Sequence, residues 1–423
     1  MKRLLAMLAA ALLAAACHNG GINQNSTDLR ALNAVPDAEP LDVLVDGDVK
    51  FGAVPSGTAT SYTNFDSGSR EVVVRSSTNQ GVLFDKSLTF SGDSRGTLVV
   101  FGRRNAINTL FLVDDTTTPA SGKTRVRFAG AAADAGSIDV YLTTSDLSGA
   151  GSAAISGTVA GGVSAVSEVA TGSYRVILTT AGTQDILFQS AGTVALNAGA
   201  GLTLAATSSL GGKLVNAVII EPGTSGAVTP LANPVARIKA ANAVADSTAL
   251  NFKADGAMLL TAVPFAGVSS YVNTAAGSHA LQLEASNVPG ANAATATRSL
   301  EAARDYTMLA TGSIASPGIA LIADDNTLPS SGNAKLRFVN AAGGANVDAL
   351  VNFASQATGI APATASAYYS IAAGTSYTIT FTTPGGVNVV ASLTGVELDS
   401  GNVYTAYVFG PASNAQAKLV RDR

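Results

Sequence analysis

Much of the chain alternates polar and apolar residues, as a β-strand does when one face lies in a core and the other in water. The alternation is clear at 125–128, 281–284 and 378–382. Glycine, asparagine, aspartate and serine interrupt it about every 8–12 residues, which is the rhythm of short strands in a sandwich. No segment keeps the 3.6-residue period of an amphipathic helix for long. The pattern therefore predicts an all-β fold.

Two Asp-Gly dipeptides mark expected hairpin turns. Asp46-Gly47 and Asp255-Gly256 each follow an apolar run. Both residue types tolerate the positive φ angles of tight hairpin turns, so we expect a strand on either side of each dipeptide.

The second half of the chain repeats the first. The acidic segment that begins at Asp114 recurs at Asp324, and the strand-like segment 125–128 recurs at 335–338, in both cases 210 residues later. A spacing of 209 residues relates Asp46 to Asp255, Tyr62 to Tyr271, and Gly68 to Gly277. Internal repeats of this kind indicate tandem structural units.

Each half is itself double. Gly102, Gly312 and Gly410 are each followed twelve residues later by an aspartate. The second quarter is the most divergent, since Ser209 and Glu221 would hold these two places and a Gly/Ala/Ser-rich insertion lies at about 147–165. The spacing predicts four modules of about 100 residues, at 30–122, 123–233, 234–332 and 333–423.

We expect each module to be an Ig-like, antiparallel β-sandwich, with a single closed sheet as the alternative. Short linkers that contain a proline, such as 116–123, favour a semi-rigid rod of modules in series.

The first 16 residues have the pattern of a signal peptide. Lys2 and Arg3 precede the apolar run 4–16. This run has about 13 residues, whereas a membrane-spanning helix needs about 20. The small residues before Cys17 resemble a lipobox, the motif after which bacteria acylate a cysteine, although Ala14 stands where leucine is usual. The alternative is ordinary secretory cleavage beside an unrelated cysteine.

Cys17 is the only cysteine in the chain. It excludes disulfides, and a lone free thiol would be a liability in an exported protein, so we predict covalent lipid on Cys17. By resemblance to enteric lipoproteins, His18 after the cysteine favours the outer membrane, with the face left open. Residues 17–29 are then the lipidated cysteine and a polar, flexible tether.

The opening of the first module, 31–47, resembles the bacterial domain of unknown function 4397, whose signature runs roughly R-V-x-H-A-S-P-D-A-P-x-V-D-V-Y-V-D-G. The family's usual histidine is Asn33 here, and Asn340 in the fourth module. The family has no established activity, and the resemblance implies an exported, repeated, sandwich-like domain of envelope or surface proteins. Further segments that fit the template are 125–128 with 138–141, and 337–341 with 347–348.

Composition narrows the classes of partner. The formal net charge is −4, and no cluster of lysine and arginine is present to neutralise a row of phosphates. Nucleic acid is therefore excluded as an expected partner. The chain has no tryptophan and is 6% aromatic, which is poor in the rings on which sugars stack.

Catalytic residues are scarce. The two histidines are His18 in the tether and His279 in a strand-like stretch, and the chain lacks the G-x-S-x-G, S-x-x-K and H-E-x-x-H motifs. We therefore predict that the protein is not an enzyme and has no cofactor beyond the lipid on Cys17.

Two aspartate pairs, Asp114-Asp115 and Asp324-Asp325, lie at expected junctions between modules. Paired carboxylates are candidate calcium ligands that would stiffen a junction, although calcium takes six to eight oxygens. The alternative is that each pair ends a strand and keeps its edge soluble.

Tyr368-Tyr369 is the one adjacent aromatic pair and the candidate ligand-binding site, although alternation would place one ring in the core. The sequence thus favours a non-catalytic, lipid-anchored envelope protein that serves surface structure, adhesion or protein interaction. The alternative is a surface or periplasmic lipoprotein that binds carbohydrate or a small ligand. The partner, an envelope protein or a glycan, is not specified.

Overall fold

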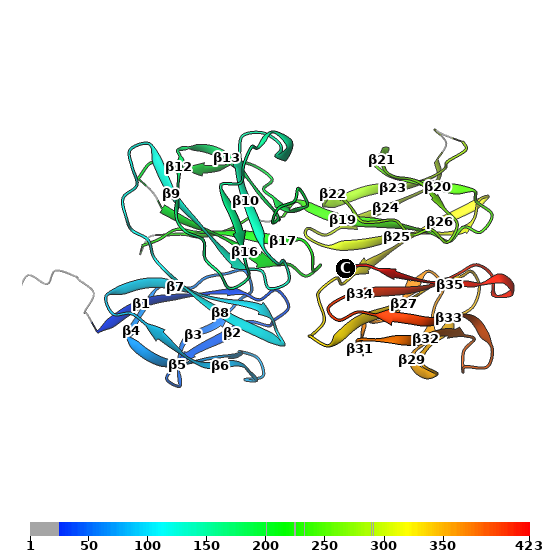
Figure 1. The fold of residues 1–423 in the computed structure, drawn as a ribbon, viewed down its shortest axis with the longest axis horizontal. Coiled ribbons are helices and arrows are strands. Elements are labelled where there is room, and N and C mark those ends of the chain that lie inside the picture. Colours follow the sequence, from blue (N-terminus) through cyan, green and yellow to red (C-terminus); the bar gives the residue numbers. More distant parts are fainter. Residues whose placement is uncertain (1–24, 200, 224–225, 232, 289, 291) are drawn as a thin grey trace, which may run out of the picture.

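The computed structural model describes residues 25–423, except 200, 224–225, 232, 289 and 291. The predicted signal peptide, Cys17 and most of the tether lie outside the described residues. The predicted end of the tether at residue 29 is wrong, because residues 26–29 already belong to the first strand, Ser26–Ala34. Within them, the strands form eight small sheets, two to each of four modules (Figure 1). None of the described residues belongs to a helix long and apolar enough to cross a membrane. The predicted all-β fold of four tandem sandwich modules is confirmed.

In the first module, one sheet has the strand order β4-β1-β7-β8 and the other has the order β3-β2-β5-β6. Its strands are β1 (Ser26–Ala34), β2 (Leu41–Val45), β3 (Asp48–Val54), β4 (Thr63–Asp66), β5 (Gly68–Ser76), β6 (Val82–Phe90), β7 (Ser94–Arg103) and β8 (Ala106–Val113).

The second module has the orders β12-β9-β16-β17-β18 and β11-β10-β13-β14, with β15 paired to β13. Its elements are β9 (Lys123–Ala131), β10 (Ile138–Thr143), the 3₁₀ turn η1 (Leu147–Gly149), β11 (Ile155–Thr158), β12 (Ser167–Ala170), β13 (Gly172–Thr180), β14 (Ile186–Gln189), β15 (Val194–Leu196), β16 (Gly201–Ser208), β17 (Val215–Ile220) and β18 (Val228–Leu231).

The third module repeats the first, with the orders β22-β19-β25-β26 and β21-β20-β23-β24. Its strands are β19 (Val235–Asn242), β20 (Ala249–Ala254), β21 (Ala257–Pro264), β22 (Val272–Ala275), β23 (Gly277–Ala285), β24 (Asn292–Leu300), β25 (Asp305–Ser313) and β26 (Ser316–Asp324).

The fourth module has the orders β30-β27-β34-β35, with β31 also on β27, and β29-β28-β32-β33. Its elements are β27 (Asn333–Ala341), β28 (Val347–Val351), β29 (Ala354–Ile360), β30 (Thr364–Ala365), β31 (Tyr369–Ala372), β32 (Gly374–Thr382), β33 (Val389–Leu398), β34 (Val403–Phe409), the 3₁₀ turn η2 (Ala412–Asn414) and β35 (Gln416–Arg421).

The residues that the polar–apolar alternation predicts to face inward lie in the cores. In β9, Val126 and Phe128 are at most 1% exposed and belong to the core of the second module. In β32, Ile379 and Phe381 are fully buried in the fourth. The Asp-Gly turns also form as expected: Asp46 and Asp255 both have φ +51°, and the glycine that follows each of them has a positive φ as well.

One strand pair in each module is parallel. The alternation of polar and apolar residues could not predict this, because it is the same for either direction of a strand. The first strand of each module lies beside a strand that returns from the second sheet. Such a crossover is required because parallel neighbours cannot be joined by a hairpin. The four parallel pairs are β1–β7, β9–β16, β19–β25 and β27–β34.

The modules pack face to face in two pairs, first with second and third with fourth (Figure 1). The expected semi-rigid rod is therefore wrong. In a rod, the outer face of each parallel pair would expose an apolar patch, and folding back buries it. The buried clusters are Leu32, Ala34, Val99, Phe101, Leu112, Ala129, Ala131, Ala205, Val218 and Ile220 in the first pair, and Ala241, Ala243, Ala266, Leu309, Val339, Ala341, Tyr407 and Phe409 in the second.

The connection between the two pairs is short and held by a buried amide. β18 ends at Leu231 and β19 begins at Val235. Asn233 is fully buried between them, and its side chain donates to the carbonyls of Leu187 and Val215 at 2.9 and 2.8 Å. These bonds tie the connection to the second module.

A buried asparagine holds a loop at the end of the first strand in three modules. These residues are Asn33, Asn242 and Asn340, at most 2% exposed. Each side-chain amide donates to a carbonyl at the end of a neighbouring hairpin and accepts from the backbone N–H two residues on. Asn33 and Asn340 occupy the place of the histidine in the signature that the sequence resembles. Their role here is to satisfy buried backbone groups.

The substitution Asn242→Ala is expected to lower the free energy of unfolding by about 2 kcal/mol or more, because it leaves the Val263 carbonyl and the Val244 N–H without partners. Asn273→Ala, at an exposed position of β22, is the control and should change it by less than about 0.5 kcal/mol. Urea unfolding of the mature chain measures both. Equal losses would contradict the assigned role.

Candidate functional site

A basic residue on the first strand of each module faces the paired module. It lies opposite a threonine on the parallel strand, and the three arginines donate Nε to that threonine at 2.7–2.9 Å. The pairs are Arg30–Thr97, Arg127–Thr203, Lys239–Thr307 and Arg337–Thr405. We call the region where these residues meet the other module of the pair the charged joint.

In three modules, an aspartate lies at the end of the next strand along the chain after the one that carries this threonine. Thr307 and Thr405 donate their hydroxyls to Asp324 and Asp422. Asp114 occupies the same position in the first module. In the second module, strand pairing places Pro222 there, so Glu221 is not the structural counterpart that spacing alone indicated. The second module therefore has no carboxylate at this position.

In the second pair, the ions cross the joint in both directions. Lys239 of the third module pairs with Asp422 of the fourth, and Arg337 of the fourth pairs with Asp324 of the third. All four side chains are at most 1% exposed. Removing one of these side chains would leave its partner buried and unpaired, which is strongly destabilising while the two modules stay packed together.

Tyrosine rings cover these cations. Tyr271 lies 5.0 Å from Lys239 Nζ, and its hydroxyl donates to Asp324 at 2.5 Å. Tyr368 lies over Arg337, 4.9 Å from ring centroid to guanidinium carbon. Contacts of this kind are favourable, and more so where water is excluded.

The two tyrosines predicted as a ligand site therefore lie on different sides of one sheet. Tyr368 covers cations within the joint. Tyr369 packs against the core of the fourth module, with its ring 6.1 Å from that of Phe338. This agrees with the expectation that one ring faces the core.

The ionised forms are stabilised at this joint. Burial raises the pKa of Asp324, but Arg337 and Lys239 outweigh that effect and hold it below the ordinary value of 3.8. Burial lowers the pKa of Lys239, but its interactions with Tyr407, Asp422 and Asp324 more than offset this and raise it. Both groups are therefore charged at neutral pH, as fixed ion pairs and not as a proton-transfer couple.

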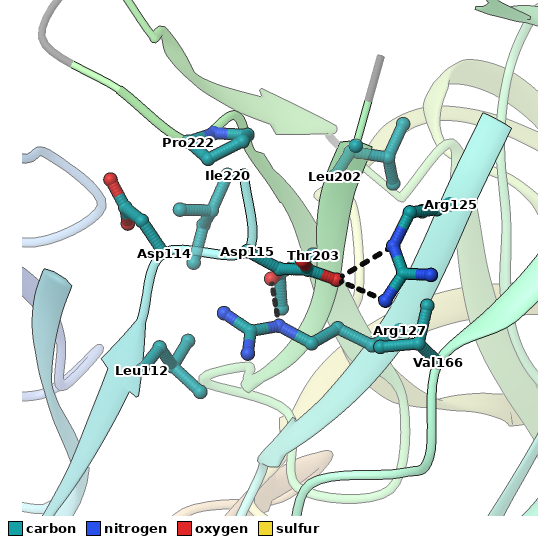
Figure 2. A pocket seen from close by; sticks show the side chains of 11 residues that line it. Leu112, Asp114, Asp115, Arg125, Arg127, Val166, Leu202, Thr203, Ile220 and Pro222 are labelled. Carbon is teal, nitrogen blue, oxygen red and sulfur yellow. Dashed lines mark hydrogen bonds and ion pairs between the residues drawn. The ribbon is translucent and has the colours of Figure 1, made fainter. Parts of the chain in front are cut away.

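The first pair builds the same joint with fewer charges. Figure 2 shows Arg127 of this joint bonded to Thr203. Arg127 donates to the carbonyl of Val113 at 2.5 Å, and Arg30 donates to the carbonyl of Glu221 at 2.7 Å. Val166 stands where the fourth module has Tyr368, so no ring covers Arg127. A hollow of about 10 Å³ lies there, with room for about one water.

The four aspartates predicted as calcium candidates all lie at the junctions, and protein groups engage each of them. Asp115 binds Arg125 at 2.8 Å, and Asp325 binds Lys335 at 2.8 Å. Asp114 accepts from the Tyr62 hydroxyl at 2.8 Å, and Asp324 pairs with Arg337.

In the described part of the chain, no three His, Cys, Asp or Glu side chains gather as a metal site. Calcium binding stays a prediction, and at three of the four aspartates it would have to replace an ion pair.

His279 serves a hairpin. Its Nδ1 lies 2.6 Å from an oxygen of Asp255, in the turn between β20 and β21, and its Nε2 lies 2.9 Å from the carbonyl oxygen of Ala275. Both ring nitrogens are thus engaged by local structure.

One signal in the sequence could have revealed the parallel strand pairing within each odd-numbered module. Asp28 faces Arg95 at 2.7 Å across β1–β7, and Arg237 faces Asp305 at 2.8 Å across β19–β25. These positions are related by the repeat, and the two halves carry the pair with the charges exchanged. When both charges of a pair change sign, their attraction is preserved. The exchange therefore indicates contact between residues about 67 apart in sequence.

The substitution Arg337→Met should lower the free energy of unfolding by about 3–5 kcal/mol, because it removes the cross-joint partner of buried Asp324. Lys335→Met, whose partner Asp325 is 50% exposed, is the control and should cost about 1 kcal/mol or less. Urea unfolding of both variants measures the difference. Comparable losses would show that burial of the joint contributes little.

Asp324 also predicts a pH dependence. Because its folded-state pKa lies below 3.8, its contribution to stability is complete above that pH and is lost as the pH falls through the lower folded value. The stability difference between the wild type and Asp324→Asn should thus be constant from neutral pH down to about 4 and then shrink. A difference that shrinks already between about pH 7 and 5 would show a raised pKa instead.

Comparison with solved structures gives low similarity. A family 26 carbohydrate-binding module from Eubacterium rectale Amy13K, solved with maltoheptaose, is 13% identical with a TM-score of 0.16, over 47% of this chain and 98% of that one. The Bacillus anthracis TIE protein is 12% identical with a TM-score of 0.16, over 92% of this chain and 68% of that one. No curated protein matches.

The family described as "Domain of unknown function (DUF4397)" matches residues 27–141 and 236–345. Each match runs through an odd-numbered module and its linker and past the first strand of the next module. Each therefore includes an aspartate of the joint and the basic residue that follows it, Asp114 with Arg127 and Asp324 with Arg337. The two matches cover more than half of the chain, which therefore belongs to the DUF4397 family.

Proposed function

We propose that this protein is a non-catalytic lipoprotein of the bacterial cell envelope whose paired modules form a rigid scaffold for surface structure, adhesion or protein interaction. One observation carries the proposal. The groups best suited to chemistry, Lys239, Asp324, Arg337 and Asp422, are at most 1% exposed and hold two modules together. Held in ion pairs and shielded from water, they support a structural role.

Paired modules present edges that suit a protein partner. β6 has 9 residues and β33 has 10, and each lies at the edge of its sheet. The free backbone groups of an edge strand can pair with an extended segment of another chain. Strand addition at such an edge is the mode of interaction that we propose.

The anchor in this proposal is lipid on Cys17, and the outer membrane is the proposed location because His18 follows the cysteine. β1 begins at Ser26. The residues between them, 18–25, reach at most about 30 Å when extended, so the first pair would lie close to the membrane surface.

Binding of a carbohydrate or small ligand is the alternative. Tyr368 and Tyr369 are both half-buried and lie on opposite sides of one sheet, so they offer no shared stacking platform for a sugar. A glycan partner would have to use another surface. The specific observation that favours a small ligand is a pocket of about 290 Å³ between the first two modules.

Metabolic labelling with a fatty acid tests the anchor. The wild-type protein should incorporate label, because the cysteine thiol is the acylation site, and Cys17→Ser should lose all of it. Asn19→Ser, two residues away, is the matched control and should label as the wild type does. A wild-type protein whose processed N-terminus carries a bare thiol by mass spectrometry would overturn the anchoring. Protease treatment of intact cells then tests whether the modules face outward.

A further inference from the structure

A pocket of about 290 Å³ opens between the first two modules, away from the charged joint. No charged and no aromatic residue lines it. Pro36, Ser56 and Gly57 on the first module face Thr207, Ser208 and Leu231 on the second. The wall is mainly apolar, with a few hydroxyl and amide groups.

The duplicated half of the chain shows how this space arises. Ser56 corresponds to Phe265, because the next residues, Gly57 and Ala266, donate to the equivalent asparagine carbonyls at 2.7 and 2.8 Å. Phe265 packs edge to face against Phe409, with ring centroids 6.4 Å apart. Aromatic rings thus fill the corresponding space in the second pair.

The second module lacks the other ring as well. Phe101, Thr207 and Phe409 each lie four residues after the threonine of the charged joint in their modules. Phe101 is 3% exposed and lies against Gly161 of the second module. Thr207 is too small to fill the corresponding space on the second module's side of the interface. The pocket therefore results from small residues at two positions that hold phenylalanine elsewhere in the chain.

The pocket also has a hydroxyl without a partner. Ser208 is 4% exposed, and no side chain or backbone group of the described residues bonds its Oγ. An unsatisfied buried hydroxyl costs about 1–3 kcal/mol. This Oγ is closed off from solvent, so the hydrogen bond of a ligand would fall to other polar groups of the wall, such as the half-buried Asn216.

We propose that this pocket binds a small, neutral, mainly apolar molecule that carries one hydrogen-bonding group. An ion would lose its hydration with no opposite charge in the wall to compensate. A sugar would find no ring on which to stack. The volume lies near the lower end of the range of ligand pockets, about 300–1,000 Å³. This inference does not depend on the envelope location or the scaffold role.

N-phenyl-1-naphthylamine, a neutral apolar fluorophore with one N–H group, is the probe. It is titrated into the mature chain carrying Cys17→Ser, so that neither lipid nor detergent competes for it. We expect saturable binding at one site with a rise in fluorescence. Ser56→Phe, which restores the ring of the duplicate, should weaken binding at least about tenfold, or about 1.4 kcal/mol.

Three further variants sharpen the test. Ser56→Ala removes the hydrogen bond from Ser56 to the Val35 carbonyl without filling the space, and should bind as the parent does. Thr207→Phe fills the pocket from the second module and should weaken binding even where Ser56→Phe does not fold. Ser208→Ala removes a hydroxyl that is closed off from the pocket and should bind as the parent does. Absence of saturable binding, or binding that neither phenylalanine variant reduces, would overturn the proposal.

Discussion

The structure depends on the burial of charge between modules. In the second pair, Lys239 and Arg337 project from first strands whose inner faces are already filled by core residues, and each finds its counter-ion in the other module. Modules held apart would expose the shared apolar cluster around Leu309 and Tyr407 to water, whereas the pair buries it and gives each buried charge its partner. The parallel strand pairing matters for the same reason, since it sets each cation beside the threonine that orients the carboxylate.

The buried basic residues of the two module pairs bind different groups. The first uses backbone carbonyls to receive Arg30 and Arg127, where the second uses carboxylates. The family match is informative here, because each matched stretch extends across the linker and contains both an aspartate and the following basic residue of a joint. The unit that recurs is therefore more than a single sandwich, and it includes the contact by which one module holds the next.

The sequence predicted what local periodicity encodes. The strands, the Asp-Gly turns and the four-fold repeat follow from alternation and spacing, and Val126 and Phe128 face the core as expected. Face-to-face pairing did not follow, because Arg127 and Arg337 occupy the polar phase of the alternation and have the pattern of solvent-exposed residues. The junction position of the aspartates was predicted, whereas their cationic partners were not, since those lie on strands of another module. Tyr368 was singled out as an aromatic, but its contact with Arg337 depends on tertiary packing alone.

Small-angle X-ray scattering of the mature chain tests the central claim, that the modules are held in face-to-face pairs. A compact chain of about 400 residues has a radius of gyration of roughly 21 Å, so the paired arrangement predicts a value between about 21 and 30 Å. Four modules end to end would give about 45 Å. A value near the second figure, or a distance distribution with the long tail of a rod, would contradict the account.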